Sequence, residues 1–400
     1  MKLIISNTQK GKSLVYIFIF SAIISFFYAI FTQTYNGDFL GIEVKITTVE
    51  LIFNLFTSII PFIFLYFIYL RFSRTNRFRK KIQVPMNFFF KFLVIIMGWN
   101  IIVTLLYGVG IMGADAYTAP QGIKLVIQIM NRFNYLYGAF VFILCTKKSD
   151  KRDLIILLLL LILAYFRAGL GSFMYIGMIM FIKYNFEVRK LYSRNKIKFL
   201  VCIICFPLIV STLYAVRNSL RNQEEDYSNP VTGKFFGRMS SFSDSAMILQ
   251  ESAYFSDSVK NLDFFYFQKQ ALGVFSVELI PKVRPEIMVF KLYYGDLEDN
   301  VAYMAGTQGN LYISYLKSPI LLVINILSFY VYIIIIFRLF QVLKFEYNME
   351  LALILSLYVV MSGVSNEFAF IILSILVYII LFYFINTFTR TVIFPKNRII

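Results

Sequence analysis

Long apolar runs are the feature that most constrains how this chain can fold. Several of them reach the roughly 20 residues that a helix needs to cross the hydrocarbon core of a bilayer. The mean hydropathy of the 400 residues is +0.71, and 59% of them are hydrophobic, which exceeds the roughly half that is usual in soluble domains. We therefore expect an all-α, polytopic membrane protein.

The apolar runs predict about ten transmembrane helices. The first run is as long as a full span, so we expect it to be kept as a span and not cleaved as a signal peptide. The expected spans cover residues 13–32, 49–70, 92–112, 123–145, 154–166, 172–186, 197–216, 319–340, 349–362 and 368–388.

The distribution of charge predicts the orientation of these spans. The chain has 39 Lys and Arg, 22 Asp and Glu and a net charge of +17. With both termini inside, most basic residues fall on one side of the membrane, as the positive-inside rule requires, and most acidic residues fall on the other. The basic character therefore indicates orientation and affinity for anionic lipid, not binding to nucleic acid. The segments expected inside are 1–12, 71–91, 146–153, 183–198, 338–348 and 389–400.

One long connection stands out in what we expect to be a single domain, residues 1–400. Residues 217–304 form a large extracytoplasmic loop, and loops of this length usually have a structure or function of their own. Apolar residues at helical spacing in 239–249 and 264–275 predict short amphipathic helices. We expect these helices to lie on, or dip into, the outer leaflet.

The residue types limit the chemistry. Histidine is absent, which excludes His-based acid–base catalysis and His metal sites. The three cysteines, Cys145, Cys202 and Cys205, lack partners for a metal site, so we expect packing roles and no metal or cofactor. A general base would have to be a carboxylate. The candidates, which the sequence does not rank, are Asp244, Glu278, Glu286 and Asp299.

A short span with an arginine at its end is the most informative site. At about 1.5 Å per residue, the span 154–166 is about 20 Å long, whereas the hydrocarbon core is about 30 Å thick. Arg167 should therefore lie below the outer membrane surface, beside a helix that Ser172 would cap. An arginine next to a helix N-terminus suits an anion such as a lipid diphosphate. The alternative is an arginine that extends from a tight turn to the surface.

Other basic residues are further candidate ligands of an anion. Arg132 lies in the middle of the span 123–145, where an ionised side chain is functional by default. Alternatively, it pairs with an acid on a neighbouring helix or marks a misplaced span end. Arg217 and Arg221 are one helical turn apart and would share a face. The remaining candidates in the long loop are Arg238, Lys282 and Arg284.

Four sequence elements together resemble the O-antigen polymerase (Wzy-type) family of bacterial envelopes. They are the arginine–glycine hairpin 167–172, the arginine and polar residues at 238–242, the proline-rich basic stretch 280–286 and the segment 309–316 that leads into the next span. The resemblance covers roughly residues 160–330, and the expected topology matches over the rest of the chain.

The resemblance implies a metal-independent glycosyltransferase of the bacterial cytoplasmic membrane. Such an enzyme polymerises polyprenyl-diphosphate-linked oligosaccharide repeat units into an O-antigen or capsule at the outer face of that membrane. The implied partners are the lipid-linked oligosaccharide, membrane lipids, and a chain-length regulator and flippase of the same pathway. By this resemblance the arginines would bind diphosphate, and a loop carboxylate would act as the base.

Two other functions remain open at this stage. An O-antigen ligase shares the architecture, but its catalytic pattern includes an outer-loop histidine, which this chain lacks. A flippase of lipid-linked oligosaccharide would usually have more spans, short outer loops and an internal repeat, and no repeat is visible here.

Overall fold

The protein is almost entirely helical in the computed structural model. The structure describes residues 7–75, 81–111, 120–148, 150–167, 170–197, 201, 212, 237–294 and 305–393. Within these residues, five helices are long and apolar enough to cross a membrane. The predicted all-α class with several candidate spans is therefore confirmed.

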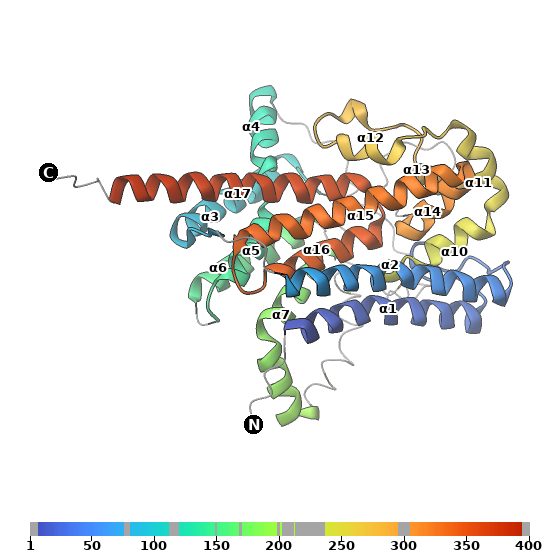
Figure 1. The fold of residues 1–400 in the computed structure, drawn as a ribbon, viewed down its shortest axis with the longest axis horizontal. Coiled ribbons are helices and arrows are strands. Elements are labelled where there is room, and N and C mark those ends of the chain that lie inside the picture. The colour runs from blue at the N-terminus through green and yellow to red at the C-terminus, as the bar shows by residue number, and fades with distance from the viewer. Residues whose placement is uncertain are drawn as a thin grey trace.

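Four of the five long helices lie side by side in Figure 1. They are α1 (Asn7–Thr32), α2 (Thr48–Arg74), α15 (Pro319–Val342) and α17 (Ser365–Ile393). Between 33% and 39% of each most apolar window is buried inside the molecule. Most of this apolar surface therefore faces outward, which suits contact with lipid and not with water.

A shorter helix, α16 (Asn348–Ser362), forms the centre of this bundle. It contacts α1, α2, α15 and α17, and almost all of its side chains are buried. Because it is surrounded by other helices, it can be apolar on every side without facing lipid. It ends at Gly363, whose positive φ of 72° forms a left-handed helix cap.

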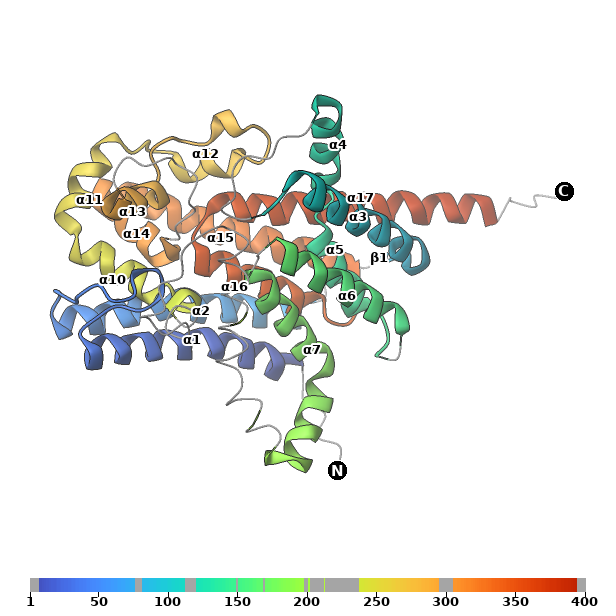
Figure 2. The same ribbon diagram turned by 180° about the vertical axis from the view of Figure 1, so that it is seen from behind.

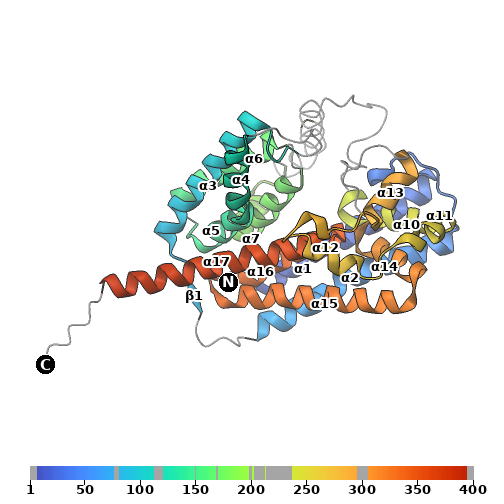
Figure 3. The same cartoon turned by 90° about the horizontal axis from the view of Figure 1, so that it is seen from above.

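A second group of helices lies beside α17 in Figure 3. It consists of α3 (Met86–Tyr107), the fifth long helix, together with α5 (Tyr135–Cys145), α6 (Lys151–Phe166) and α7 (Leu170–Arg194). These helices contact one another through the pairs α3–α5, α3–α6, α5–α6 and α5–α7. Two of them, α5 and α6, are much shorter than the long helices α1, α2, α15 and α17.

The expected span 123–145 is not one helix. It is divided into α4 (Gln121–Arg132) and α5, because Asn134 leaves the helical conformation and its side chain caps the N-terminus of α5. Figure 2 shows α4 crossing the direction of the long helices. The apolar side chains of Leu125 and Ile129 are exposed, as in a helix that lies along a membrane interface. A different expected span, 197–216, lies almost wholly outside the described residues.

Short helices cover one end of the bundle in Figure 1. We call residues 237–294 and 305–317 the head. Its helices are α10 (Phe242–Gln250), α11 (Ser252–Ser258), α12 (Tyr266–Leu272), α13 (Pro285–Tyr294) and α14 (Gly306–Lys317).

The two amphipathic segments predicted in the long loop are helical, as α10 and α12. Their surroundings differ from the prediction for α10, however. Met239, Ala246 and Met247 are buried, and α10 packs against α1, α2 and α14. Its apolar face therefore belongs to the protein core and not to a lipid leaflet, whereas Leu272 and Phe275 at the end of α12 are exposed.

The segments predicted to share one side of the membrane meet at the other end of the bundle. Strands β1 (Ile82–Gln83) and β2 (Leu343–Lys344) pair in parallel, and the Asn386 side chain donates a hydrogen bond of 2.7 Å to the Gln83 carbonyl. The Lys10 ammonium lies 4.6 Å from the centre of the Tyr347 ring. We call this region the basic end.

Close backbone packing joins the head to α16. A Cβ added to Gly363 would lie 2.3 Å from the carbonyl carbon of Gly306. Around this contact, Ser241 Oγ donates to the Met361 carbonyl and Thr307 Oγ1 to the Val360 carbonyl, each at 2.5 Å. The carbonyl groups at the end of α16 are thereby satisfied by side chains of the head.

The close glycine contact leads to a stability prediction. Gly363→Ala should destabilise the protein by at least about 1–3 kcal/mol, because the added methyl group meets backbone that cannot move aside and because φ is positive. Gly98→Ala is the matched control, since nothing lies within 4 Å of its added Cβ. Thermal unfolding in detergent should show a lower midpoint for Gly363→Ala alone; equal midpoints would contradict the close packing.

Candidate functional site

Arg167 is held at the end of α6 by neutral polar groups. Its Nη2 donates to Asn100 Oδ1 at 2.7 Å and its Nε donates to Thr104 Oγ1 at 3.0 Å. Its guanidinium also lies 5.1 Å from the centre of the Tyr135 ring. Space for the side chain depends on Gly110, because a Cβ there would lie 2.9 Å from Arg167 Cζ.

These contacts fix the position of Arg167 without neutralising its charge. Asn100 and Thr104 lie one turn apart on α3 and are both buried, so they direct two neutral oxygens at the guanidinium. Among the described residues, no carboxylate forms an ion pair with Arg167. The positive charge therefore remains available to attract an anion.

Arg167 directly follows a short helix, as predicted, but the predicted cap is wrong. With 16 residues, α6 is about 24 Å long, which is less than the roughly 30 Å of a hydrocarbon core. The next helix begins at Leu170, which places Ser172 inside its first turn and not at its N-cap. The backbone has already entered the helix before Ser172 is reached.

Arg238 is paired with an acid from a distant part of the chain. Its guanidinium forms an ion pair with Asp38, whose side chain is 9% exposed. The two segments approach closely because both contain glycine: a Cβ on Gly237 would lie 2.2 Å from the Gly37 backbone nitrogen. Arg238 is therefore not the uncompensated cation that the sequence suggested.

Asp244 lies buried near this ion pair, with 4% exposure. Burial raises the pKa of the Asp244 carboxyl well above its usual value, and the negative charge of Asp38 raises it further, while Arg238 opposes the shift. Neighbouring polar groups are engaged with one another: Ser243 Oγ donates to Asn36 Oδ1 at 2.6 Å. This arrangement is a structural polar core in which a neutral Asp244 is favoured.

Glu286 occupies a different kind of site. Its Oε1 accepts a hydrogen bond of 3.3 Å from Gln270 Nε2, and Arg284 Nε lies 3.8 Å from its Oε2. Oε2 is buried and has no hydrogen-bond partner. Glu286 therefore presents one oxygen that can still accept a proton, next to a cation.

The surroundings of Glu286 make its carboxylate a stronger base than an exposed one. Burial raises the pKa of the Glu286 carboxyl above its usual value, while hydrogen bonds from its own backbone and from Gln270, and the charge of Arg284, oppose the shift. A carboxylate with a raised pKa takes up a proton more readily than an exposed one. Arg284 is in turn oriented by a 3.0 Å hydrogen bond to the Pro281 carbonyl.

Hydrogen bonds connect Glu286 to the start of α17. Ser365 Oγ donates to Gln270 Oε1 at 3.0 Å, and this leaves the amide group of Gln270 directed at Glu286. Ser362 Oγ donates to Glu367 Oε2 at 2.6 Å, just beyond the glycine contact that ends α16. Through Gln270, the Glu286 site is thus hydrogen-bonded to the start of α17, close to the contact of Gly363 that joins the head to the bundle.

The other predicted residues lie apart from these sites. Glu278 and Lys282 are exposed. Arg132 is exposed at the end of α4 and donates a 2.6 Å hydrogen bond to the Val274 carbonyl, so its placement in the middle of a span is wrong. Three predicted residues lie outside the described part of the chain: Arg217, Arg221 and Asp299.

The partners of the predicted residues were missed by sequence reasoning. Asp38, Asn100, Thr104 and Gln270 each lie far along the chain from the group that they contact. A signal existed only for Asn100 and Thr104, which are polar residues four apart in an apolar helix. That spacing places both on one face.

Comparison of the chain with protein-family models, curated proteins and solved structures gives no match. Within the described residues, no group of three or more acidic or cysteine side chains is placed to hold a metal ion. Function is therefore inferred from the geometry of the Arg167 and Glu286 sites.

The environment of Asp244 predicts how stability depends on pH. Because its folded-state pKa is raised, Asp244 stabilises the fold below the ordinary value of about 3.9 and loses this contribution as pH rises through the folded-state pKa. Asp244→Asn stays neutral, so its thermal stability relative to the native protein should improve between pH 4 and pH 8. Asp257→Asn, at an exposed position, is the control and should show no such gain. If Asp244→Asn also showed no gain, Asp244 would not be desolvated.

Proposed function

We propose that the protein is a glycosyltransferase that polymerises polyprenyl-diphosphate-linked oligosaccharides at the outer face of a bacterial cytoplasmic membrane. The observation that carries the proposal is the buried Glu286 carboxylate, with one unpaired oxygen beside Arg284, in a head that covers one end of a membrane-spanning bundle. A transferase needs such a base where lipid-linked sugars meet water.

The topology proposed for this function has about ten spans with both termini in the cytoplasm, and α5 takes the place of the expected span 123–145. In it, the basic end faces the cytoplasm, as the positive-inside rule requires, and residues 237–294 of the head are the described part of the extracytoplasmic loop 217–304. The contacts of β1 with β2 and of Lys10 with Tyr347 support this arrangement, because they gather segments that the rule assigns to one side.

In the proposed reaction, the growing glycan is the donor and a new lipid-linked repeat unit is the acceptor. An acceptor hydroxyl attacks the sugar carbon that is bonded to the diphosphate of the donor, and Glu286 takes up the hydroxyl proton. The carbon–oxygen bond to the diphosphate breaks, and polyprenyl diphosphate leaves with the bonding electrons. Fixed cations that face the leaving group lower the barrier by stabilising its developing charge.

The proposal divides the cations by role. Arg284 lies beside the base and stabilises its ionised form. Arg167 holds a lipid diphosphate near the membrane surface, because its charge is oriented by neutral partners and remains uncompensated. Arg238 instead stabilises the loop that contains Asp38.

Glu286→Gln tests the base. This change keeps the shape of the side chain but removes the proton acceptor, so we expect polymer formation to fall by at least about 100-fold. Complementation of a deletion strain with each variant, followed by gel analysis of surface polysaccharide, measures the effect. Glu278→Gln is the matched control and should leave polymer unchanged; full activity of Glu286→Gln would exclude Glu286 as the base.

Arg167→Ala tests the proposed diphosphate ligand in the same assay. We expect loss of polymer with normal amounts of protein in the membrane, because the variant removes an uncompensated cation and leaves neutral partners behind. Arg132→Ala changes the same charge at an exposed position and should keep most of the activity. Unchanged polymer length and amount in Arg167→Ala would remove Arg167 from the mechanism.

Deletion of the gene distinguishes the proposed activity from its rivals. Loss of polymer, with single repeat units still on the carrier lipid or at the surface, is the expected result. Full-length polymer trapped on the carrier would instead indicate a ligase, and single units trapped at the cytoplasmic face would indicate a flippase. Unchanged glycans would overturn the proposal.

A further inference from the structure

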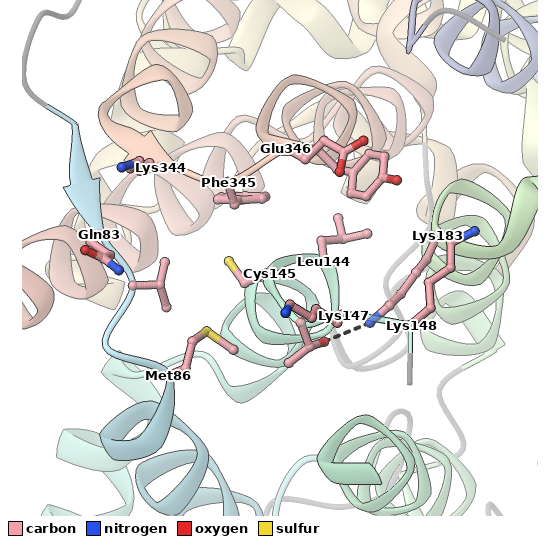
Figure 4. A pocket seen from close by; sticks show the side chains of 13 residues that line it. Gln83, Met86, Leu144, Cys145, Lys147, Lys148, Lys183, Lys344, Phe345 and Glu346 are labelled. Carbon is pink, nitrogen blue, oxygen red and sulfur yellow. Dashed lines mark hydrogen bonds between the residues drawn. The ribbon is translucent and has the colours of Figure 1, made fainter. Parts of the chain in front are cut away.

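A cavity at the basic end has no part in the proposed reaction. Its volume is about 430 Å³, and it lies where three connections of the chain meet. The walls come from the residues before α3, from the end of α5, from α7 and from the connection between α15 and α16 (Figure 4). Its lining consists of Gln83, Val84, Met86, Leu144, Cys145, Thr146, Lys147, Lys148, Lys183, Lys344, Phe345, Glu346 and Tyr347.

Charge in this cavity is strongly biased. Four lysines and one glutamate are among the lining residues. Figure 4 shows Lys344 on one side, beside Gln83, and Lys148 and Lys183 on the other. Cations that come from separate elements and meet at one cavity suit a ligand with negative charge.

Two of the lysines are already engaged. Lys183 is 2% exposed and forms an ion pair with Asp153. Its ammonium also donates to the Ile143 carbonyl at 2.5 Å and to Thr146 Oγ1 at 2.8 Å, so its three donors are used. Lys148 pairs with Glu187 at 2.8 Å. Both lysines therefore hold the wall of the cavity together.

The other two lysines remain available. Lys147 and Lys344 are exposed, and the ammonium group of neither forms an ion pair or hydrogen bond with another described residue. They come from connections far apart in the sequence and are brought to one cavity by the β1–β2 pairing and by the Lys183 contacts. The fold thus places two uncompensated cations around a preformed space.

The rest of the lining indicates which kind of anion fits. Val84, Met86, Leu144 and Phe345 give the cavity an apolar component, and the surrounding helices include those long enough to span a membrane. A small soluble anion needs no apolar wall, whereas a phospholipid has both a phosphate and apolar carbon next to it. Basic pockets between helices at the cytoplasmic surface bind anionic headgroups in this way.

We propose that this cavity binds the phosphate headgroup of an anionic phospholipid, with Lys147 and Lys344 as the ligands of the phosphate. The site is independent of the proposed polymerase reaction, because it lies at the opposite end of the bundle. Binding ties together the connections before α3, after α5 and before α16, and so stabilises the basic end.

The test is binding of lipids to the purified full-length protein in a non-ionic detergent. Phosphatidylglycerol should raise the midpoint of thermal unfolding and give bound lipid in native mass spectrometry, and phosphatidylethanolamine should do so at least about tenfold more weakly. The double variant Lys147→Ala/Lys344→Ala should lose at least about tenfold in affinity for phosphatidylglycerol. Its folding is checked by its unfolding midpoint without lipid, which should match that of the native protein.

A second double variant separates a specific site from general surface charge. Lys91→Ala/Lys151→Ala removes two exposed lysines that do not line the cavity, so the net charge changes equally while affinity should stay within about threefold. An equal loss of affinity in both double variants would overturn the proposal. The proposal would also be overturned if millimolar inorganic phosphate competed with lipid and raised the unfolding midpoint as much as phosphatidylglycerol does. The ligand would then be a free phosphate.

Discussion

A charged group cannot stay in the hydrocarbon of a bilayer without a partner or a path to water, and the arrangement of this molecule follows from that constraint. The connections before α3, after α5 and before α16, each of which contains lysine, meet at one end. Once these connections share an end, the long helices that they join must run back and forth between that end and the other. The head can then form only at the opposite end, where the turns between α1 and α2 and between α16 and α17 lie.

The sequence predicted the helices whose environment is simplest. The runs that form α1, α2, α3, α15 and α17 are apolar and long. Length and apolar composition are enough to predict a helix that can cross a membrane. The prediction was wrong for 123–145 because hydropathy averages over residues: Asn134 interrupts the helix through its side-chain cap, which an average over a window does not detect.

The candidate site was predicted only as a set of residue types. Four carboxylates looked equivalent in the sequence, and burial separates the three that the structure describes: Glu286 and Asp244 are enclosed, whereas Glu278 is exposed. What distinguishes Glu286 from Asp244 is which groups surround them, and those groups come from distant elements. Gln270 and Ser365 belong to different helices, and no pattern in the sequence relates them. The place of Arg167 at the end of a short helix could be predicted because its signal is local: a short apolar run that ends in arginine.

The seam between Gly306 and Gly363 limits how the head can move. The head and α16 meet through glycine backbones, and Ser241 and Thr307 donate hydrogen bonds to the last carbonyls of α16. Packing this close does not allow the head to swing open as a lid. The head and the bundle must then behave as one rigid frame.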